Sequence, residues 1–209
     1  CGSISNGSAG SLSIICCNGR RGRYVTVVIP GRAEYLTLCE LEVYGSRVAF
    51  WSPEKETGVE GQNLALGKPA SQSSIHHHDI VGSADKAVDG NCNGDWYNNS
   101  CIHTKNEMNP WWLVDLGEPR KISVVLVKTR YDCCAKRMYE AEVHLGNSLK
   151  DHGRANPLLL PRSCGIILNV SPGSITTIYC NGQEGRYISV HLPGKDYLNM
   201  CEVEAYGIK

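Results

Sequence analysis

The chain has 209 residues, 42% of them hydrophobic, and its 21 basic residues balance 21 acidic ones. This length allows one or two domains with a proper core. The neutral balance argues against nucleic acid or an anionic membrane surface as a partner, because both require a basic surface. No run approaches the roughly 20 apolar residues of a membrane span, so membrane insertion is not expected.

Eleven cysteines are a high count for this length. None of them forms a CxxC pair with zinc-finger spacing, so a disulfide framework in an oxidising compartment is the expected arrangement. Asn-x-Ser triplets at Asn6, Asn98 and Asn169 agree with secretion. The predicted location is extracellular.

The first 45 residues repeat a later part of the chain. Residues 22–31 (GRYVTVVIPG) align with residues 185–194 (GRYISVHLPG), and residues 39–45 (CELEVYG) align with residues 201–207 (CEVEAYG). A repeat at this distance indicates tandem domains. We interpret residues 1–45 as the C-terminal third of a first domain, and the start at Cys1 as a processed or truncated one.

Residues 46–61 form the predicted linker, because residues 52–58 are polar and rich in turn formers. Residues 62–209 form the complete domain. Its β-rich segments alternate with Gly and Pro turns and show no sustained helical period. The predicted strands are residues 111–116, 122–129, 139–145, 174–179, 186–192 and 202–206. This pattern predicts an all-β, antiparallel β-sandwich.

Directional hydrogen-bonding groups gather between His103 and Arg137. His103 is followed after 26 residues by Arg130, then by Asp132 and Arg137. Each guanidinium offers a rigid fork of N–H donors, and the imidazole offers one more. Such a set suits a ligand covered with hydroxyl groups, and it suits a metal poorly because arginine does not coordinate one.

Two adjacent cysteines, Cys133 and Cys134, lie inside the same stretch. Neighbouring Cα atoms are about 3.8 Å apart across a trans peptide, below the usual disulfide range of roughly 4.4–6.8 Å. A disulfide between them would store strain and would give a stiff, apolar sulfur surface beside the donors. The alternative, in which each cysteine pairs elsewhere, stays open on these residues alone.

The spacing of His103, Arg130, Asp132 and Arg137 resembles the fucose-binding signature of the F-type lectins (fucolectins). Other motifs that resemble this family follow in order: residues 89–91 (DGN), 100–103 (SCIH), 109–116 (NPWWLVDL), the Cys-Cys pair and residues 201–204 (CEVE). The resemblance covers residues 62–209. It implies a discoidin-like jelly roll with binding loops at one end of the sandwich.

The resemblance also implies a site for terminal L-fucose. The two arginines would donate hydrogen bonds to the oxygens of the sugar, and Asp132 would orient both guanidinium groups. The cysteine pair and an aromatic ring would contact the apolar part of the sugar. The simpler alternative for each arginine is an exposed ion pair, worth about 0–1 kcal/mol. The predicted carbohydrate-binding residues are His103, Arg130, Arg137, Asp132, Cys133, Cys134, Trp96 and His78.

The run of His76, His77 and His78 is not expected to bind a metal. Adjacent side chains on an extended segment point to opposite faces, so the three imidazoles cannot easily reach one ion. The resemblance places this loop at the rim of the sugar pocket. One of the three is expected to touch the ligand, and the sequence does not decide which.

A structural Ca²⁺ site is implied as well. Ca²⁺ takes six to eight oxygen ligands, many of them backbone carbonyls on loops. On the residues alone, a turn aspartate and an edge-strand glutamate would be the simpler interpretation. The predicted ion ties the loop of residues 89–100 to the last strand, and its predicted ligands are side-chain or carbonyl oxygens of Lys86, Asp89, Asn91, Ser100, Cys201 and Glu202.

Four disulfides follow from the two repeats and the resemblance. They are Cys101–Cys201, Cys133–Cys134, Cys164–Cys180 and Cys1–Cys17, which leaves Cys16, Cys39 and Cys92 unassigned. No nucleophile elbow, phosphate loop or His-Glu-x-x-His motif occurs, so the chain is not expected to be an enzyme.

The sequence therefore predicts a secreted, calcium-stabilised lectin for fucosylated glycans, with a role in innate immune recognition implied by the resemblance. One sugar and one Ca²⁺ are expected per chain, because residues 1–45 lack counterparts of His103, Arg130 and Arg137. Homo-oligomerisation is left open. The alternative is a discoidin-like adhesion module that binds protein or lipid surfaces. Such a module would need exposed, projecting apolar side chains in place of the His/Arg/Arg cluster.

Overall fold

The computed structural model describes residues 1–4, 13, 15, 17, 20, 22–43, 62–77, 79–153 and 163–208. All regular elements lie between residues 70 and 207, and no α-helix occurs in the described part of the chain. None of its helices is long and apolar enough to cross a membrane. The predicted linker, residues 46–61, lies outside the described residues.

Strands and 3-10 helices alternate along the domain. In chain order they are β1 (Ala70–Gln72), η1 (Ala84–Ala87), η2 (Trp96–Asn98), β2 (Ile102–His103), β3 (Glu107–Met108), β4 (Trp111–Lys128), η3 (Ala135–Met138), β5 (Glu142–Gly146), η4 (Lys150–Gly153), β6 (Ser163–Ile166), β7 (Ile175–His191), β8 (Lys195–Asp196), β9 (Asn199–Met200) and β10 (Glu202–Gly207).

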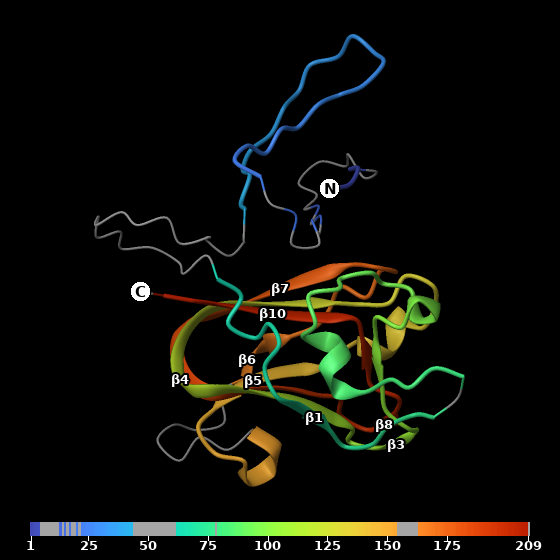
Figure 1. The fold of residues 1–209 in the computed structure, drawn as a ribbon, viewed down its shortest axis with the longest axis vertical. Helices are drawn as coiled ribbons and strands as arrows, with labels where there is room; N and C mark the ends of the chain where they lie inside the picture. The colour runs from blue at the N-terminus through green and yellow to red at the C-terminus, as the bar shows by residue number, and fades with distance from the viewer. Residues whose placement is uncertain are drawn as a thin grey trace.

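The antiparallel pairing of two long strands organises the sandwich. The main sheet has the order β1-β4-β7-β5-β6, and β10 pairs with the other end of β4. The β4–β7 register is interrupted between Asp115 and Arg120 and again between Ile122 and Val124. Figure 1 shows β4 curving at this point from one layer of the domain to the other. The prediction of an antiparallel β-sandwich is confirmed.

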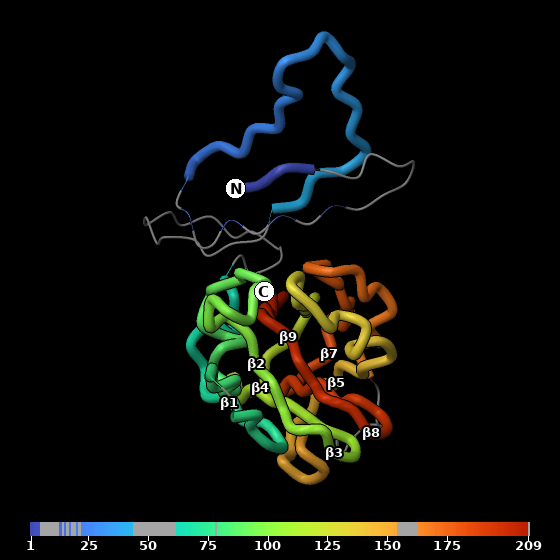
Figure 2. Tube along the Cα trace, turned by 90° about the vertical axis from the view of Figure 1, so that its right-hand side faces the viewer, coloured from blue at the N-terminus to red at the C-terminus, as the bar shows by residue number. Residues whose placement is uncertain are grey.

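Four of the predicted strands are in fact two longer ones. The predicted pair 111–116 and 122–129 is the single strand β4, and the predicted pair 174–179 and 186–192 is the single strand β7. Gly117, at φ 93°, makes a bend in β4 and does not end the strand. β2, β3, β8 and β9 were not predicted, since two residues are too few to show alternation; Figure 2 shows them as the pairs β2–β9 and β3–β8.

The core lies between the two layers and is nearly all aliphatic. Its largest member, Trp112 on β4, is fully buried, and its indole N–H donates to the carbonyl of Ala84 at 2.9 Å. This bond satisfies the polar end of the side chain and fixes η1 against the sheet. Other fully buried side chains include Ile102, Ile122, Met138, Ile167, Ile188, Leu198 and Met200.

All four predicted disulfides are present: Cys101–Cys201, Cys133–Cys134, Cys164–Cys180 and Cys1–Cys17. Cys92, which was left unassigned, is also disulfide-bonded. Cys39 is a free, exposed thiol, and Cys16 lies outside the described residues.

Residues 22–43 of the predicted first copy contain no strand. Figure 1 shows them projecting away from the sandwich. Their assignment to a partial first domain stays a prediction.

We expect the Cys101–Cys201 bond to stabilise the domain more than the Cys164–Cys180 bond does. The first closes a separation of 100 residues and the second one of 16. In the chain-entropy account, such loops give about 4–5 and about 3 kcal/mol respectively. Urea unfolding of the two Cys→Ala double variants measures the difference. A larger loss for the Cys164/Cys180 variant would contradict this account.

Candidate functional site

A pocket of ≈ 320 Å³ opens beside β2, η2 and η3. Six predicted sugar-site residues line it: Trp96, His103, Arg130, Cys133, Cys134 and Arg137. His76, one of the three histidines between which the sequence did not decide, also lines it, and three residues that were not predicted complete the lining: Asp79, Ile80 and Tyr97. The structure therefore brings together segments that are far apart in the sequence, and most of the predicted set lies in one hollow.

The short helix η3 positions one side of the pocket. It begins after Cys134, whose backbone is left-handed (φ 64°), and the amide of Arg137 donates to the carbonyl of Cys134 at 3.1 Å. Ala135 and Met138 are buried in the domain. These two side chains fix the helix, so Arg137 on the same turn reaches the pocket.

Arg130 is held as a rigid donor. Only 5% of the residue is exposed, its guanidinium makes two bonds to the carboxylate of Asp132, and it lies 5.2 Å from the centre of the Trp96 ring. Asp132 also accepts the Trp96 amide at 3.3 Å. Burial would raise the pKa of Asp132, but its bonds to Arg130 and Trp96 outweigh burial and lower this pKa.

Arg137 is held by different groups. Its guanidinium lies 4.5 Å from the ring centre of Tyr197, and its Nε lies 3.8 Å from an oxygen of Asp196. The expectation that Asp132 holds both arginines is therefore wrong: among the described residues, the ion pair of Asp132 is with Arg130, and the carboxylate near Arg137 is that of Asp196. Tyr197 and Asp196 belong to the β8–β9 segment, and no motif in the sequence points to them.

His103 presents an acceptor to the pocket, not the donor that was expected. Its Nδ1 lies 2.7 Å from the carbonyl oxygen of Thr104. A carbonyl only accepts, so Nδ1 carries the hydrogen and Nε2 has the free lone pair. Burial, together with the charges of His76, Arg130 and Arg137, lowers the pKa of His103 to about 4. The ring is thus neutral near pH 7.

Close packing fixes the imidazole of His103. The His76 ring centre lies 4.7 Å from it, that of Tyr197 lies 5.2 Å away and that of Trp96 5.3 Å away. A Cβ on Gly82 would come within 2.5 Å of the His103 amide nitrogen, so only glycine fits there.

Among the three consecutive histidines, His76 lines the pocket. His77 forms an isolated bridge with Val81, and His78, which was included in the predicted site, lies outside the described residues. The sequence singled out this run but could not choose within it, because the choice depends on how the loop turns.

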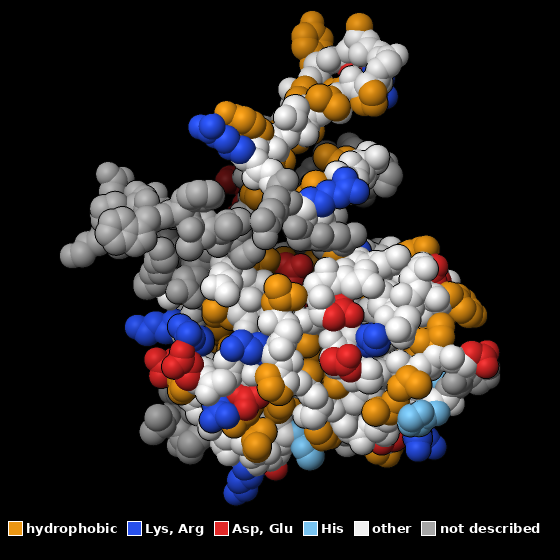
Figure 3. All heavy atoms as spheres, in the orientation of Figure 1, with side chains coloured by type: hydrophobic (Ala, Val, Ile, Leu, Met, Phe, Trp, Pro, Cys, Tyr) orange, Lys and Arg blue, Asp and Glu red, His pale blue; other side chains and the backbone are white. Residues whose placement is uncertain are grey.

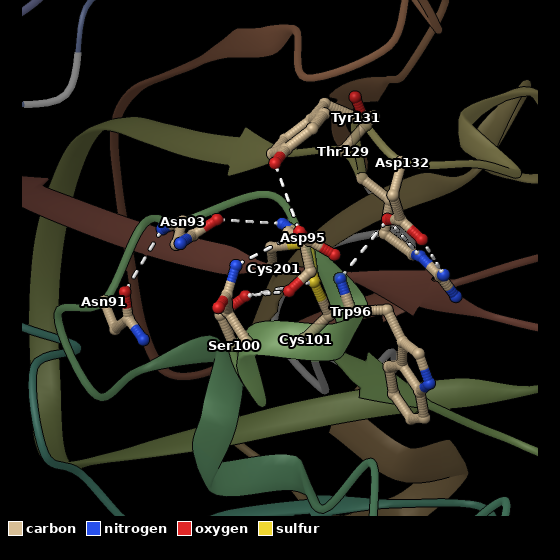
Figure 4. Close-up of a disulfide and its surroundings, with 12 residues drawn as sticks. Asn91, Asn93, Asp95, Trp96, Ser100, Cys101, Thr129, Tyr131, Asp132 and Cys201 are labelled. Atoms are coloured by element: carbon tan, nitrogen blue, oxygen red, sulfur yellow. Dashed lines mark hydrogen bonds and ion pairs between the residues drawn. A yellow bond between two sulfur atoms is a disulfide. The ribbon is translucent and has the colours of Figure 1, made fainter. Parts of the chain in front are cut away.

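The loop of residues 89–100 carries a series of side-chain-to-backbone bonds. The carboxylate of Asp89 accepts the Asn91 amide, Asn91 accepts the Asn93 amide, and Asn93 accepts the Asp95 amide, at 2.8, 3.3 and 3.0 Å. The hydroxyl of Ser100 donates to the carbonyl of Asp95 at 2.8 Å. Figure 4 shows Asn91, Asn93, Asp95 and Ser100 around the Cys101–Cys201 disulfide, which joins the end of the loop to the start of β10.

Glu202 is the most strongly perturbed carboxyl group in this region. The residue is 2% exposed, and neither carboxylate oxygen has a hydrogen-bonding partner. Burial, then the charges of Glu204 and Asp89, raises its pKa to about 9, although the charge of Lys128 opposes the shift. Burial raises the pKa of Asp89 as well.

A buried carboxylate without partners beside a second carboxylate fits a Ca²⁺ ion, which accepts oxygen ligands and cancels both charges. Within the described residues, no group of three or more His, Cys, Asp or Glu side chains is arranged around a common metal position. The predicted ligand set relies on carbonyl groups for its remaining oxygens, so it does not require such a group.

Comparison with known proteins decides the family. A family model described as a NedA-like, galactose-binding domain matches residues 86–190. A fucolectin from Anguilla anguilla is 35% identical over 150 residues, which cover 70% of this chain and 92% of that protein. The chain belongs to the fucolectin (F-type lectin) family.

Solved structures agree with this assignment. The fucolectin from Morone saxatilis serum is 41% identical, with a TM-score of 0.65 over 72% of this chain and 49% of that one. This chain therefore matches about half of that fucolectin. The lectin domain of lectinolysin, solved with Lewis B antigen, is 31% identical with a TM-score of 0.57, over 69% of this chain and 95% of that one. These relatives are lectins, and the prediction of a binding protein in place of an enzyme is confirmed.

We predict that His103 titrates near pH 4 in the folded protein and near 6.5 in the unfolded chain. The unfolded state then binds the proton first, so the free energy of unfolding is unaffected above about pH 7 and falls as the pH drops from 6.5 toward 4. The full loss is about 3 kcal/mol. NMR of the imidazole measures the pKa directly.

The variant His103→Gln is the control for this linkage. The unchanged protein should lose stability relative to this variant as the pH drops from 6.5 to 5, because other titrating groups, Glu202 included, contribute equally to both proteins and cancel in the difference. Equal pH dependence in the two proteins would contradict the burial argument.

Proposed function

We propose that residues 62–209 are a calcium-stabilised lectin domain that binds terminal L-fucose on glycans. The observation that carries this proposal is the pocket itself, in which two oriented guanidiniums, one neutral imidazole acceptor and a disulfide face a single hollow. Relatives whose names state fucose binding or a Lewis antigen ligand support it.

Each polar group of the pocket suits a hydroxyl-rich ligand. A sugar hydroxyl both donates and accepts, so it can receive an N–H from Arg130 or Arg137 and donate to Nε2 of His103. The weak contact between the His103 Nε2 and Arg137, 3.5 Å long, leaves this acceptor available to the ligand. Both arginines are already paired with carboxylates, so a neutral sugar does not leave an uncompensated charge.

The apolar groups suit the methyl group and the ring face of the sugar. Cys133 and Cys134 form a disulfide on one wall, and Trp96, Tyr97 and Ile80 also line the pocket. A deoxy sugar carries one carbon without a hydroxyl, and this carbon gains from contact with sulfur and hydrocarbon. The disulfide cannot donate a proton, so it does not compete for the sugar's acceptors.

The Ca²⁺ ion has a structural role in this proposal. Asp89, Ser100 and Glu202 would provide side-chain oxygens, and carbonyl groups of Lys86, Asn91, Ser100 and Cys201 would provide the others. When bound, the ion supplies positive charge to the buried carboxylates. It ties the loop to β10, and the sugar need not touch it because the pocket has its own donors.

A secreted lectin acting in innate immune recognition is the biological setting we propose. The disulfides and the serum origin of one relative support it. Fucosylated glycans on foreign or host surfaces are the proposed partners.

Replacing Arg130 by Ala should weaken L-fucose binding by about 10- to 100-fold, because hydrogen bonds from charged donors contribute about 1.5–3 kcal/mol. Arg130→Lys should retain little of the affinity for L-fucose, because an ammonium group lacks the planar set of N–H donors that Asp132 orients in arginine. Titration calorimetry measures both variants, and Arg137→Ala should behave similarly.

Arg120→Ala is the matched control, since Arg120 pairs with Glu118 at the exposed bend of β4. It should bind as the unchanged protein does. An Arg130→Ala protein that bound fucose within a factor of two would show that the pocket has another ligand.

Calcium should raise the melting temperature of the protein, and a chelator should lower it, because an ion that binds only the folded state stabilises that state. Glu202→Gln should abolish the response. In chelator this variant should be about as stable as the unchanged protein, since burial already keeps Glu202 protonated without the ion and glutamine is a neutral group of the same size.

Glu184→Gln changes an exposed carboxylate on β7 and serves as the control for calcium. It should keep the full calcium response. Differential scanning fluorimetry with and without chelator is sufficient, and a Glu202→Gln protein with an unchanged response would refute the calcium site.

A further inference from the structure

One loop forms a wall of the pocket and is open to solvent on its outer side. We call residues 74–77 and 79–82, which lie between β1 and η1, the pocket loop. It contributes three lining residues: His76, Asp79 and Ile80. Three of its side chains are exposed: His77, Asp79 and Val81. Figure 3 shows histidine atoms at the surface on the side of the sandwich where β3 and β8 lie in Figure 1. The position of the loop therefore depends on contacts on its inner side.

Both ends of the pocket loop bond to the main chain of His103. The amide of His76 donates to the carbonyl of His103 at 2.8 Å, and the amide of His103 donates to the carbonyl of Gly82 at 3.1 Å. His103 belongs to β2, and its Nε2 is the acceptor that the pocket offers to a ligand. Movement of either end of the loop would therefore change the surroundings of this imidazole.

Gln72 bonds to the same three segments. It is the last residue of β1 and lies opposite Trp112 in the β1–β4 register, so its side chain points to the interior as that of Trp112 does. Its Nε2 lies 2.6 Å from the carbonyl oxygen of Ser74, 3.0 Å from that of Gly82 and 3.3 Å from that of His103. Carbonyl groups only accept, so the amide nitrogen is the atom that faces them. One side chain thus holds the start of the loop, its end and β2.

The other atom of this amide indicates that Gln72 does more than stabilise the fold. Its Oε1 is buried and has no hydrogen-bond partner among the described residues. A buried acceptor without a partner lowers the stability of the folded state. An apolar side chain of similar size would remove this cost, but it would also remove the donors that hold the loop. The placement of the loop is therefore what the domain gains from a glutamine here.

We propose that Gln72 is a positioning residue of the sugar pocket, whose amide N–H groups hold both ends of the pocket loop against the main chain of His103. Gln72 is not among the residues that line the pocket, so it acts through the loop. The loop keeps the ring of His76 at 4.7 Å from that of His103 and encloses the imidazole in its neutral form. The effect on sugar binding rests on the proposed function, whereas the placement of the loop does not.

The variant Gln72→Met tests this role, because it removes the N–H donors and keeps a neutral, unbranched side chain. Its affinity for L-fucose, measured by titration calorimetry, should fall about tenfold, which corresponds to the loss of one or two hydrogen bonds. Its melting temperature should change little, because the buried acceptor is removed as well. An unchanged affinity would overturn the proposal.

Gln183→Met is the matched control. Gln183 lies opposite Ile122 in the β4–β7 register, is partly buried, and does not line the pocket. This variant should bind L-fucose as the unchanged protein does. A tenfold loss of affinity in both variants would show that the substitution acts without the loop, and this would also overturn the proposal.

The titration of His103 gives a measurement that needs no sugar. In Gln72→Met the loosened loop admits water to the imidazole, so the pKa of His103 should rise from about 4 toward its ordinary value of 6.5. NMR of the imidazole measures this pKa, and a value that stays near 4 in the variant would overturn the proposal. An unchanged protein that does not bind L-fucose would refute the proposed function, while this pKa would still decide the role of Gln72.

Hydrogen exchange decides the matter even if Gln72→Met does not fold. In the unchanged protein the amides of His76 and His103 should exchange as slowly as the amide of Asp115, which donates to the carbonyl of Pro69 beside β1 at 2.9 Å. In a folded Gln72→Met protein these two amides should lose protection while that of Asp115 keeps it. Rapid exchange of the His76 or His103 amide in the unchanged protein would overturn the proposal.

Discussion

The pairing of β4 with β7 is the constraint on which the rest of the domain depends. β4 pairs with β7 on both sides of its bend, and it also pairs with β1 and β10, so one strand takes part in both layers. Where β4 ends therefore decides where the site lies. Thr129 follows the strand, is fully buried, and bonds to the carbonyls of Ser171 and Ser174. Arg130 comes next in the chain, so its position at the pocket follows from the sheet and needs little support from the loop.

Charge is balanced inside the pocket before any ligand arrives. Arg130 is paired with Asp132, and Arg137 lies near Asp196 and against the ring of Tyr197. The His103 imidazole stays neutral because burial and two nearby guanidiniums disfavour its charged form. A site of this kind has strong, oriented donors and one acceptor but little unpaired charge. It favours a neutral polar ligand, whereas a phosphate or carboxylate would find arginines whose charge is already compensated.

The sequence was sufficient for those parts of the site that depend on spacing along the chain. His103, Arg130 and Arg137 could be found because their spacing is a family signature, and Cys133 and Cys134 because they are adjacent. The support of Arg137 by Tyr197 and Asp196 could not be found, since it depends on how β8 and β9 fold back over η3. The number of strands was wrong for a related reason. Glycine and proline mark a change of direction, and only the pairing partners decide whether a strand bends there or ends.

The proposed cation site and the proposed sugar pocket consist of different residues but are joined through one disulfide bond. Glu202 follows Cys201, which is bonded to Cys101, and Ile102 and His103 follow directly as β2. The same loop carries Asp89 at one end and Trp96 near the other, and Trp96 contacts both Arg130 and His103. Without the cation, burial keeps Glu202 protonated, so no ionic contact would hold Asp89 and its loop to β10. Movement of the loop would reach the indole before it reached the arginines, which the sheet holds. Loss of the cation should therefore first loosen the packing of Trp96 in the pocket, while the guanidinium of Arg130 stays paired with the carboxylate of Asp132.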